Sequence, residues 1–230
     1  MKEELFDLSP EYEAMLNQGI KLSGEDMVFF ITGRLNAVRS WRQGESPVTS
    51  CLDFGCGLGH TTSRLARLFS DASTTGVDTS KNALEAARLH NGGPRIRYLP
   101  VTELDSDPAQ YDVCYVNGVF HHIPPPERPS ALALIRRKLR PHGRLFLFEN
   151  NPWNPGARMV MARIPFDRNA VMMSPRQTAG LLRRGGFDIE GVSSYFFFPR
   201  LLGVFRPLEP LIGWTRLGAQ YLVVGRPTDG

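Results

Sequence analysis

The stretch that decides the fold reads Cys51-Leu52-Asp53-Phe54-Gly55-Cys56-Gly57-Leu58-Gly59-His60. An apolar run over 48–54 stops at three glycines spaced one residue apart, and a helical pattern follows over 61–69. We therefore predict a strand, a tight turn and a helix, because glycine lets a backbone turn sharply and lets a ligand lie against it. The dinucleotide fingerprint G-x-G-x-x-G has its third glycine where this chain has His60, so the spacing argues against a dinucleotide loop. The alternative is a strand-to-helix bend that binds nothing.

A second acidic residue, Asp78, ends a strand-like run over 73–77. It lies about 20 residues beyond the glycine turn, the offset at which an acidic side chain meets ribose hydroxyls in doubly wound folds. A carboxylate accepts from both hydroxyls of a ribose and repels a 2′-phosphate. The alternative is that Asp78 caps the helix expected over 80–90, but Ser80 can cap that helix while Asp78 binds.

The composition is that of a globular domain and argues against a nucleic-acid-binding or membrane-spanning protein. Of 230 residues, 42% are hydrophobic and 22% charged, which suits one α/β domain with a small appendage. The net charge of +4 is modest and forms no dense basic stripe, so we expect no nucleic-acid partner. The amino terminus carries no signal-peptide pattern and no apolar run reaches the roughly 20 residues that span a bilayer. Cys51, Cys56 and Cys114 lack metal-ligand spacing, so we expect a cytoplasmic protein without a metal site.

Strands and helices alternate through the middle of the chain. We predict strands at 48–54, 72–77, 95–101, 111–117 and 142–149, and helices at 60–69, 80–90 and 127–139. Alternation with short connections predicts a parallel sheet with helices on both faces.

The two ends of the chain read differently. Residues 1–46 are expected to form an N-terminal helical cap, with helices opening near Ser9 and Ser23, and 47–230 to form the core. An ordered insertion is expected at about 150–173. Beyond it we predict a helix at 178–184 and strands at 187–198 and 220–225. The apolar segment 195–214 reads as sheet core with a covering helix, or else as a membrane-facing or dimer-forming patch.

With Asp53 before it, the G-x-G-x-G loop resembles the nucleotide-binding loop of the class I S-adenosylmethionine (SAM)-dependent methyltransferases of small molecules. Further segments are similar to the same family. Tyr111-Asp112 resembles the start of its fourth strand, and residues 119–124 resemble the segment that follows that strand. Leu139–Leu145 resembles the "LKPGG-L" motif that leads into the fifth strand, and Arg184–Phe187 resembles the "AGF" motif that leads into the sixth. The resemblance runs from Pro47 onward. It implies a doubly wound, Rossmann-like, seven-stranded, mostly parallel sheet whose last strand is antiparallel.

The resemblance also implies SAM as cofactor, S-adenosylhomocysteine (SAH) as its product, and no metal. The cofactor contacts expected from it are Asp53, Gly55, Cys56, Gly57, Gly59, Asp78, Thr79, Thr102, Glu103 and Asn117. One position departs from the family pattern. Val101 stands where the family often has an acidic residue for the adenine amino group, so adenine recognition is expected from Thr102, Glu103 or backbone groups.

Two clusters are candidates for the chemistry. His121 and His122 follow the fourth strand on the edge where ligands bind, and either could be the base that accepts a proton, with His122 favoured. The alternative is that they fix the loop by hydrogen bonding. Glu149, Asn150 and Trp153 lie at the carboxyl end of the fifth strand and, with Tyr12 and the cap, are expected to hold a polar acceptor with an apolar or ring face. The alternative there is a rigid turn in which the asparagines bond their own backbone.

We therefore expect a methyltransferase acting on oxygen or nitrogen of a small molecule, such as a natural-product intermediate, a sugar or another metabolite. The alternatives are carbon methylation of a ring or lipid-linked substrate, and a non-catalytic nucleotide-binding Rossmann module. We expect a monomer or homodimer, a small-molecule partner and no stable membrane insertion.

Overall fold

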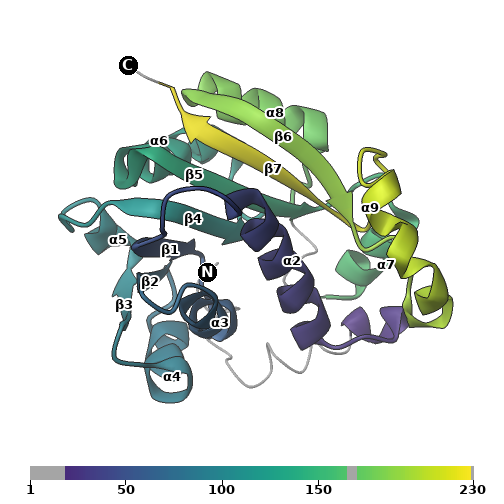
Figure 1. The fold of residues 1–230 in the computed structure, drawn as a ribbon, viewed down its shortest axis with the longest axis horizontal. Helices are drawn as coiled ribbons and strands as arrows, with labels where there is room; N and C mark the ends of the chain where they lie inside the picture. The colour runs from purple at the N-terminus through teal and green to yellow at the C-terminus, as the bar shows by residue number, and fades with distance from the viewer. Residues whose placement is uncertain (1–18, 165–169, 229–230) are drawn as a thin grey trace.

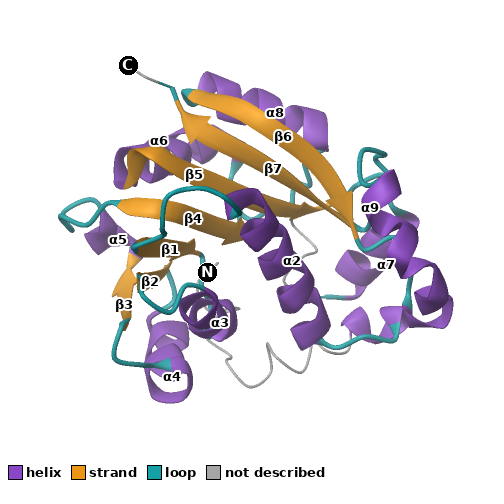
Figure 2. Ribbon diagram, viewed as in Figure 1, coloured by secondary structure: helices purple, strands orange, loops and turns teal. Residues whose placement is uncertain are grey.

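The computed structural model describes residues 19–164 and 170–228. Its strands are β1 (Ser50–Phe54), β2 (Ser73–Asp78), β3 (Ile96–Pro100), β4 (Tyr111–Asn117), β5 (Leu139–Asn150), β6 (Phe187–Tyr195) and β7 (Gln220–Pro227). Its helices are η1 (Lys21–Ser23), α2 (Met27–Arg42), α3 (His60–Leu68), α4 (Lys81–Asn91), α5 (Val101–Leu104), η2 (Pro125–Glu127), α6 (Arg128–Lys138), α7 (Pro155–Arg163), α8 (Pro175–Arg184), η4 (Arg200–Leu208) and α9 (Glu209–Ile212). Figure 1 shows their order along the chain, and Figure 2 separates helices from strands by colour.

The strands form one sheet in the order β3-β2-β1-β4-β5-β7-β6. β1 pairs in parallel with β2 and β4, whereas β7 runs antiparallel to β5 and β6. This confirms the predicted seven-stranded, mostly parallel sheet with an antiparallel last strand. Because parallel strands end at the same edge, the residues that follow β1, β2 and β4 meet there, at the point where ligands bind in such sheets.

The core covers both faces of the sheet, because successive side chains of a strand point to opposite sides. In β5, Leu145 and Leu147 pack with residues of α5, α6 and α8. Phe146 and Phe148 point the other way and pack with α2 and α3. All four side chains are fully buried. α2 therefore lies on the same face as α3 although it precedes β1 in the chain (Figure 1).

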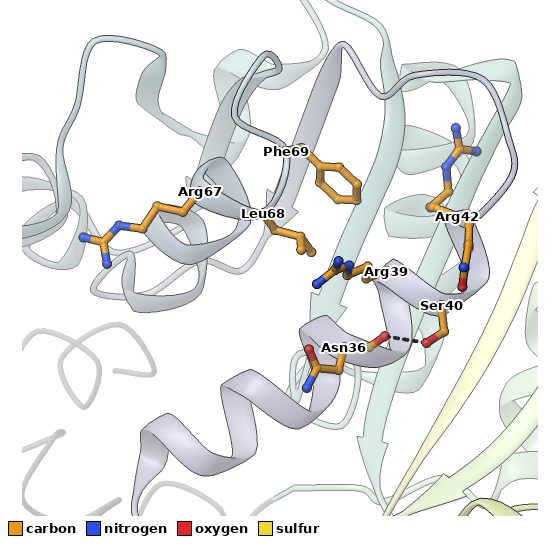
Figure 3. A pocket seen from close by; sticks show the side chains of 8 residues that line it. Asn36, Arg39, Ser40, Arg42, Arg67, Leu68 and Phe69 are labelled. Carbon is orange, nitrogen blue, oxygen red and sulfur yellow. Dashed lines mark hydrogen bonds between the residues drawn. The ribbon is translucent and has the colours of Figure 1, made fainter.

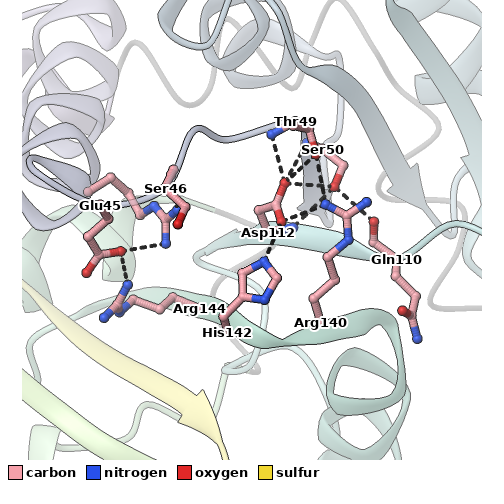
Figure 4. Close-up of polar contacts among 10 residues, drawn as sticks. Glu45, Ser46, Thr49, Ser50, Gln110, Asp112, Arg140, His142 and Arg144 are labelled. Atoms are coloured by element: carbon pink, nitrogen blue, oxygen red, sulfur yellow. Dashed lines mark hydrogen bonds and ion pairs between the residues drawn. The ribbon is translucent and has the colours of Figure 1, made fainter.

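Asp112 on β4 ties neighbouring strands together at the amino edge of the sheet (Figure 4). Its Oδ2 accepts hydrogen bonds from the backbone N–H groups of Thr49 and Ser50, at 2.8 and 3.0 Å. Its Oδ1 accepts from Arg140 Nη1 at 2.7 Å and lies 3.2 Å from His142 Nε2. Burial alone would raise the pKa of this carboxyl, but the donors around it hold the pKa well below its usual range. Asp112 therefore serves sheet assembly, away from the ligand edge.

The segment after β5 contains a helix that the sequence analysis did not predict. α7 begins at Pro155, and the Asn154 side chain caps it by accepting from the Ala157 N–H at 2.9 Å. Asparagine is a favoured N-cap and proline is favoured at the first helical position, so this Asn-Pro pair starts a helix. α8 begins in a similar way, with Ser174 and Gln177 forming a capping box.

Several predicted limits were wrong. β5 begins at Leu139 instead of residue 142, and Val101, expected to end the third strand, begins α5. β6 ends at Tyr195 instead of residue 198, because Phe196 adopts a left-handed φ of 61° that turns the chain out of the sheet. Within the segment 195–214, expected to be sheet core with a covering helix or else an exposed patch, residues 201–214 expose most of their large apolar side chains, as the second alternative requires. None of the described helices is long and apolar enough to cross a membrane.

Candidate active site

The loop after β1 holds its three glycines in left-handed backbone conformations. The φ angle is 78° at Gly55, 51° at Gly57 and 78° at Gly59, a region that other residues disfavour. A Cβ at Gly55 would lie 2.3 Å from a methyl of Val119, and one at Gly59 would lie 2.4 Å from Tyr98 Oη. A Cβ at Gly57 would meet nothing within 4 Å. The outer two glycines are therefore needed for packing, whereas Gly57 faces open space that a ligand can fill.

Asp78 holds the glycine loop. Its Oδ2 accepts from the Gly57 N–H at 2.8 Å, and its Oδ1 accepts from the Ser80 N–H at 3.0 Å. The hydroxyl of Ser80 caps α4 by accepting from the Ala83 N–H at 3.1 Å. Because each carboxylate oxygen has more than one lone pair, Asp78 keeps the capacity to accept from ribose hydroxyls at the same time.

Asp53 lies beneath the loop and is only 2% exposed. It accepts a hydrogen bond from Thr62 Oγ1 at 2.7 Å. Burial raises the pKa of Asp53 to about 7, against the opposing effect of the Thr62 hydroxyl, and the charge of Asp78 adds to the rise. A nearby cation would stabilise the ionised carboxylate. The ammonium and sulfonium groups of SAM are cations of this kind.

A cavity of about 110 Å³ lies beside the loop. Its wall includes Asp53, Cys56, Gly57 and Asn117, together with Arg34 of α2. Burial raises the pKa of the Cys56 thiol well above its ordinary value, so this side chain is a neutral part of the wall. Asn117 Oδ1 is buried without a hydrogen-bond partner among the described residues. A buried acceptor of this kind is satisfied by a ligand N–H, so the open face of Gly57, the carboxylate of Asp53 and this oxygen together fit the amino-acid end of SAM.

A larger cavity of about 500 Å³ adjoins the first, and Met27, Arg34 and Asn117 line both. Most of its wall is apolar: Ile20, Met27, Phe29, Phe30, Met159, Val160, Ile164, Phe196, Phe197, Phe198 and Pro199. The polar side chains on the wall include Asn117, His121, His122, Asn150 and Gln220. Such a wall suits a small molecule with an apolar ring face and a few polar groups.

His121 lies on this wall and is held by a buried carboxylate. Its Nδ1 lies 2.5 Å from Glu149 Oε2, and the two side chains are 3% and 1% exposed. The other oxygen, Glu149 Oε1, accepts from the Phe120 N–H at 2.8 Å. Glu149 thus contacts His121 and the backbone, whereas we had expected it to face the acceptor. The ring of His122 also lines the cavity, with its centroid 4.1 Å from that of His121.

Arg34 is a site residue that the sequence analysis missed. It is buried, and its Nε donates to Tyr115 Oη at 2.8 Å while its Nη1 donates to Gln220 Oε1 at 2.9 Å. These partners lie 81 and 186 positions away in the chain, so no local motif marks the contact. The available signal was an arginine between Ile31 and Leu35 on the buried face of one helix.

Several predicted contacts lie outside the walls of the two cavities. Thr79, Thr102 and Glu103 are exposed and, like Gly59 and Asp78, line neither cavity. Trp153 is 50% exposed and also lies outside both walls. Tyr12 lies outside the described residues. Within 19–164 and 170–228, no group of three or more His, Cys, Asp or Glu side chains could hold a metal ion.

A third hollow, of about 780 Å³, lies between the last turns of α2 and α3 (Figure 3). Arg39 and Arg67 are exposed there, beside Leu68 and Phe69. α3 starts at the glycine loop and runs back along the sheet, so its last turn reaches the opposite edge. This hollow is therefore separate from the two cavities at the ligand edge.

Comparison with known proteins extends the resemblance. Residues 51–143 match the family described as "Methyltransferase domain". The ubiquinone biosynthesis O-methyltransferase of Aeromonas salmonicida is 32% identical over 207 residues, covering 79% of this chain and 82% of that protein. O-methyltransferase cnsE of Penicillium expansum is 29% identical over 150 residues, covering 62% of this chain and 53% of that protein.

Among solved structures, a SAM-dependent methyltransferase of Thermotoga maritima, described as a possible histamine N-methyltransferase, superposes with a TM-score of 0.69. The two chains are 20% identical, and the superposition covers 98% of this chain and 99% of that one. At that identity the likeness is one of fold alone.

Proposed function

Because this chain belongs to the class I SAM-dependent methyltransferases, we propose that it methylates a hydroxyl oxygen of a small, largely apolar molecule. The Aeromonas and Penicillium relatives are both named O-methyltransferases, which supports oxygen as the acceptor atom. When bound, SAM supplies an activated methyl group on a sulfonium. The acceptor must then be aligned with that methyl, and its hydroxyl must lose a proton.

The two adjoining cavities supply the alignment. Arg34, Met27 and Asn117 lie on the wall of both, so a cofactor whose amino-acid end enters the smaller cavity meets an acceptor in the larger one at these side chains. Holding two reactants in line at short range contributes much of the acceleration in such displacements. Arg34 is a buried cation at this junction, and we assign it to the carboxylate of the cofactor's amino-acid end.

His121 is the base that we propose for the acceptor hydroxyl. If Nδ1–H donates to Glu149, the imidazole keeps its other nitrogen as the basic one, and the carboxylate stabilises the imidazolium after proton transfer. Glu149 is thus a positioning residue. The contact between His121 and Glu149 is the observation that carries the proposal, and it supports His121 over His122 as the base.

The segments around the sheet enclose the acceptor in this proposal. α2 belongs to the predicted cap of residues 1–46 and contributes Met27, Phe29, Phe30 and Arg34 to the wall of the larger cavity. α7 lies in the predicted insertion at 150–173 and contributes Met159 and Val160. We propose that both segments select the acceptor.

The test is a methyl-transfer assay with SAM and a series of substituted phenols, compared in wild type, His121→Ala, Glu149→Gln and His122→Ala. His121→Ala should lower kcat by about 10²–10⁴-fold, and the loss should shrink for phenols that are already ionised. The affinity for SAH should stay within about twofold, which is roughly 0.4 kcal/mol. Glu149→Gln should lower kcat less than His121→Ala does, and it should shift the pH dependence of kcat. His122→Ala is the matched control from the adjacent position.

If His121→Ala keeps the wild-type kcat and His122→Ala loses it, His122 is the base. Wild-type kcat in both variants would end the general-base proposal. NMR of the product identifies which atom of the acceptor is methylated. A methyl group on a ring carbon would show carbon methylation and would contradict the proposal of oxygen methylation.

A further inference from the structure

Residues 200–217 carry a row of apolar side chains that face solvent. η4, a 3-10 helix that is kinked at Leu202, and the short α9 form most of this segment, and large apolar side chains are exposed along its whole length. The most exposed are Leu201 (92%), Val204 (80%), Leu211 (70%), Trp214 (80%) and Leu217 (68%). Single exposed apolar residues are normal, but several large ones within one short segment mark an interaction surface. We call this row the 200–217 surface.

The 200–217 surface adjoins the mouth of the larger cavity. Residues 196–199 line that cavity and lead directly into η4. Asn154, at the start of α7, also lines the cavity, and its Nδ2 donates to the Leu217 carbonyl at 2.7 Å. Figure 1 shows η4 and α9 beside α7 at one end of the sheet. Met159 of α7 lines the cavity while 47% exposed, so it extends the apolar surface to the cavity rim.

The exposed charged side chains of this segment are positive. Arg200 and Arg216 are exposed, whereas Arg206 is paired with Glu25, its Nη2 lying 2.7 Å from Glu25 Oε1. Glu209 is the one acidic residue of the segment. Glu209 is turned inward, since its Oε1 accepts from the backbone N–H groups of residues 197 and 198 at 3.2 and 3.1 Å. α7 adds the exposed Arg158 and Arg163 and contains no acid.

We propose that the 200–217 surface docks on an anionic lipid bilayer and lies in its interface. Apolar side chains flanked by arginines are the pattern of segments that sit at the headgroup boundary, and a tryptophan such as Trp214 favours that depth. Each arginine near the membrane surface gains from the negative lipid headgroups. A second copy of the chain fits less well, because a two-fold contact would bring the arginines of one copy against those of the other. Docked this way, the mouth of the larger cavity opens at the membrane.

Vesicle flotation of the full chain tests this proposal. The chain should float with vesicles of phosphatidylcholine mixed with phosphatidylglycerol, and much less with phosphatidylcholine alone. Raising the salt to about 1 M, where the Debye length is about 3 Å, should release much of the bound protein. Arg200→Gln with Arg216→Gln should weaken binding to the anionic vesicles about 30-fold.

Leu201→Ser with Val204→Ser and Trp214→Ser should abolish flotation while the melting temperature and SAH affinity stay unchanged. Leu89→Ser is the matched control, because Leu89 is 77% exposed but lies on α4, and it should float like wild type. The proposal is overturned if the wild-type chain floats with neither type of vesicle. It is overturned equally if the triple variant floats unchanged, or if wild type is a dimer that the triple variant converts to a monomer.

Discussion

Replacing Gly57 by alanine should separate cofactor binding from folding. A Cβ at this position meets no atom within 4 Å, so the added methyl displaces no protein group. It points into open space beside the smaller cavity, which Gly57 lines. The fold should therefore tolerate Gly57→Ala, and the methyl should instead collide with a ligand that lies against the loop. Gly55→Ala is the matched control, because its Cβ would lie 2.3 Å from Val119.

The expected magnitudes follow from the backbone and from packing. At a φ of 51°, alanine at position 57 costs about 1–2 kcal/mol of left-handed strain. In a protein of this size that lowers the melting temperature by roughly 2–8 °C. Overpacking a ligand by one methyl costs about 1–3 kcal/mol, equivalent to about 5- to 150-fold weaker binding. Gly55→Ala adds overpacking of the protein itself to the strain, so its loss of stability should be about 2–5 kcal/mol.

Differential scanning fluorimetry and calorimetric titration with SAH give the two quantities for each variant. Gly57→Ala should show a small fall in melting temperature and a large fall in affinity, and Gly55→Ala a larger fall in melting temperature. An unchanged SAH affinity in a folded Gly57→Ala protein would refute the reasoning that the cofactor lies against this loop.

Three further outcomes are expected. Asp112→Ala should cost about 2–4 kcal/mol in urea unfolding, because it leaves the backbone N–H groups of Thr49 and Ser50 unpaired; a loss below about 1 kcal/mol would contradict this. Since burial raises the pKa of Asp53 to about 7, the folded protein binds this proton more tightly than the unfolded chain. The stability of the cofactor-free protein should therefore fall as pH rises from about 4 to 8, and Asp53→Asn should flatten that fall in thermal scans. Trp153→Ala should leave the acceptor KM within about twofold, whereas Phe197→Ala on the cavity wall should raise it about tenfold; the reverse order would support Trp153 as an acceptor contact.

The sequence allowed much of the fold to be predicted because the deciding features are local. The glycine spacing, the apolar strands and the offset of Asp78 each depend on short stretches of sequence, and the antiparallel last strand follows from the family resemblance. Ser80 was recognisable as a cap for the same reason. Asn154 was not, because an Asn-Pro pair suits both a turn and a helix start, and only the helix that follows distinguishes them.

What the sequence could not give depends on contacts between distant segments. Glu149 looked like an exposed polar residue at a strand end, but its partner His121 lies on the neighbouring strand's loop. Arg34 joins the site through partners on β4 and β7. The apolar residues of 201–214 have the spacing of a helix face, and that spacing is the same for a buried face and for an exposed one.

The most direct test of the central claim is a calorimetric titration of SAM into the full chain and its Asp78→Ala variant. The account predicts one SAM per wild-type chain, and affinity lower by about 1–3 kcal/mol in the variant, the cost of leaving buried polar partners unpaired. NAD should not bind, because His60 stands where a dinucleotide loop has its third glycine. Equal SAM affinity in the two proteins would contradict the role of Asp78, and tight binding of NAD without binding of SAM would contradict the whole account.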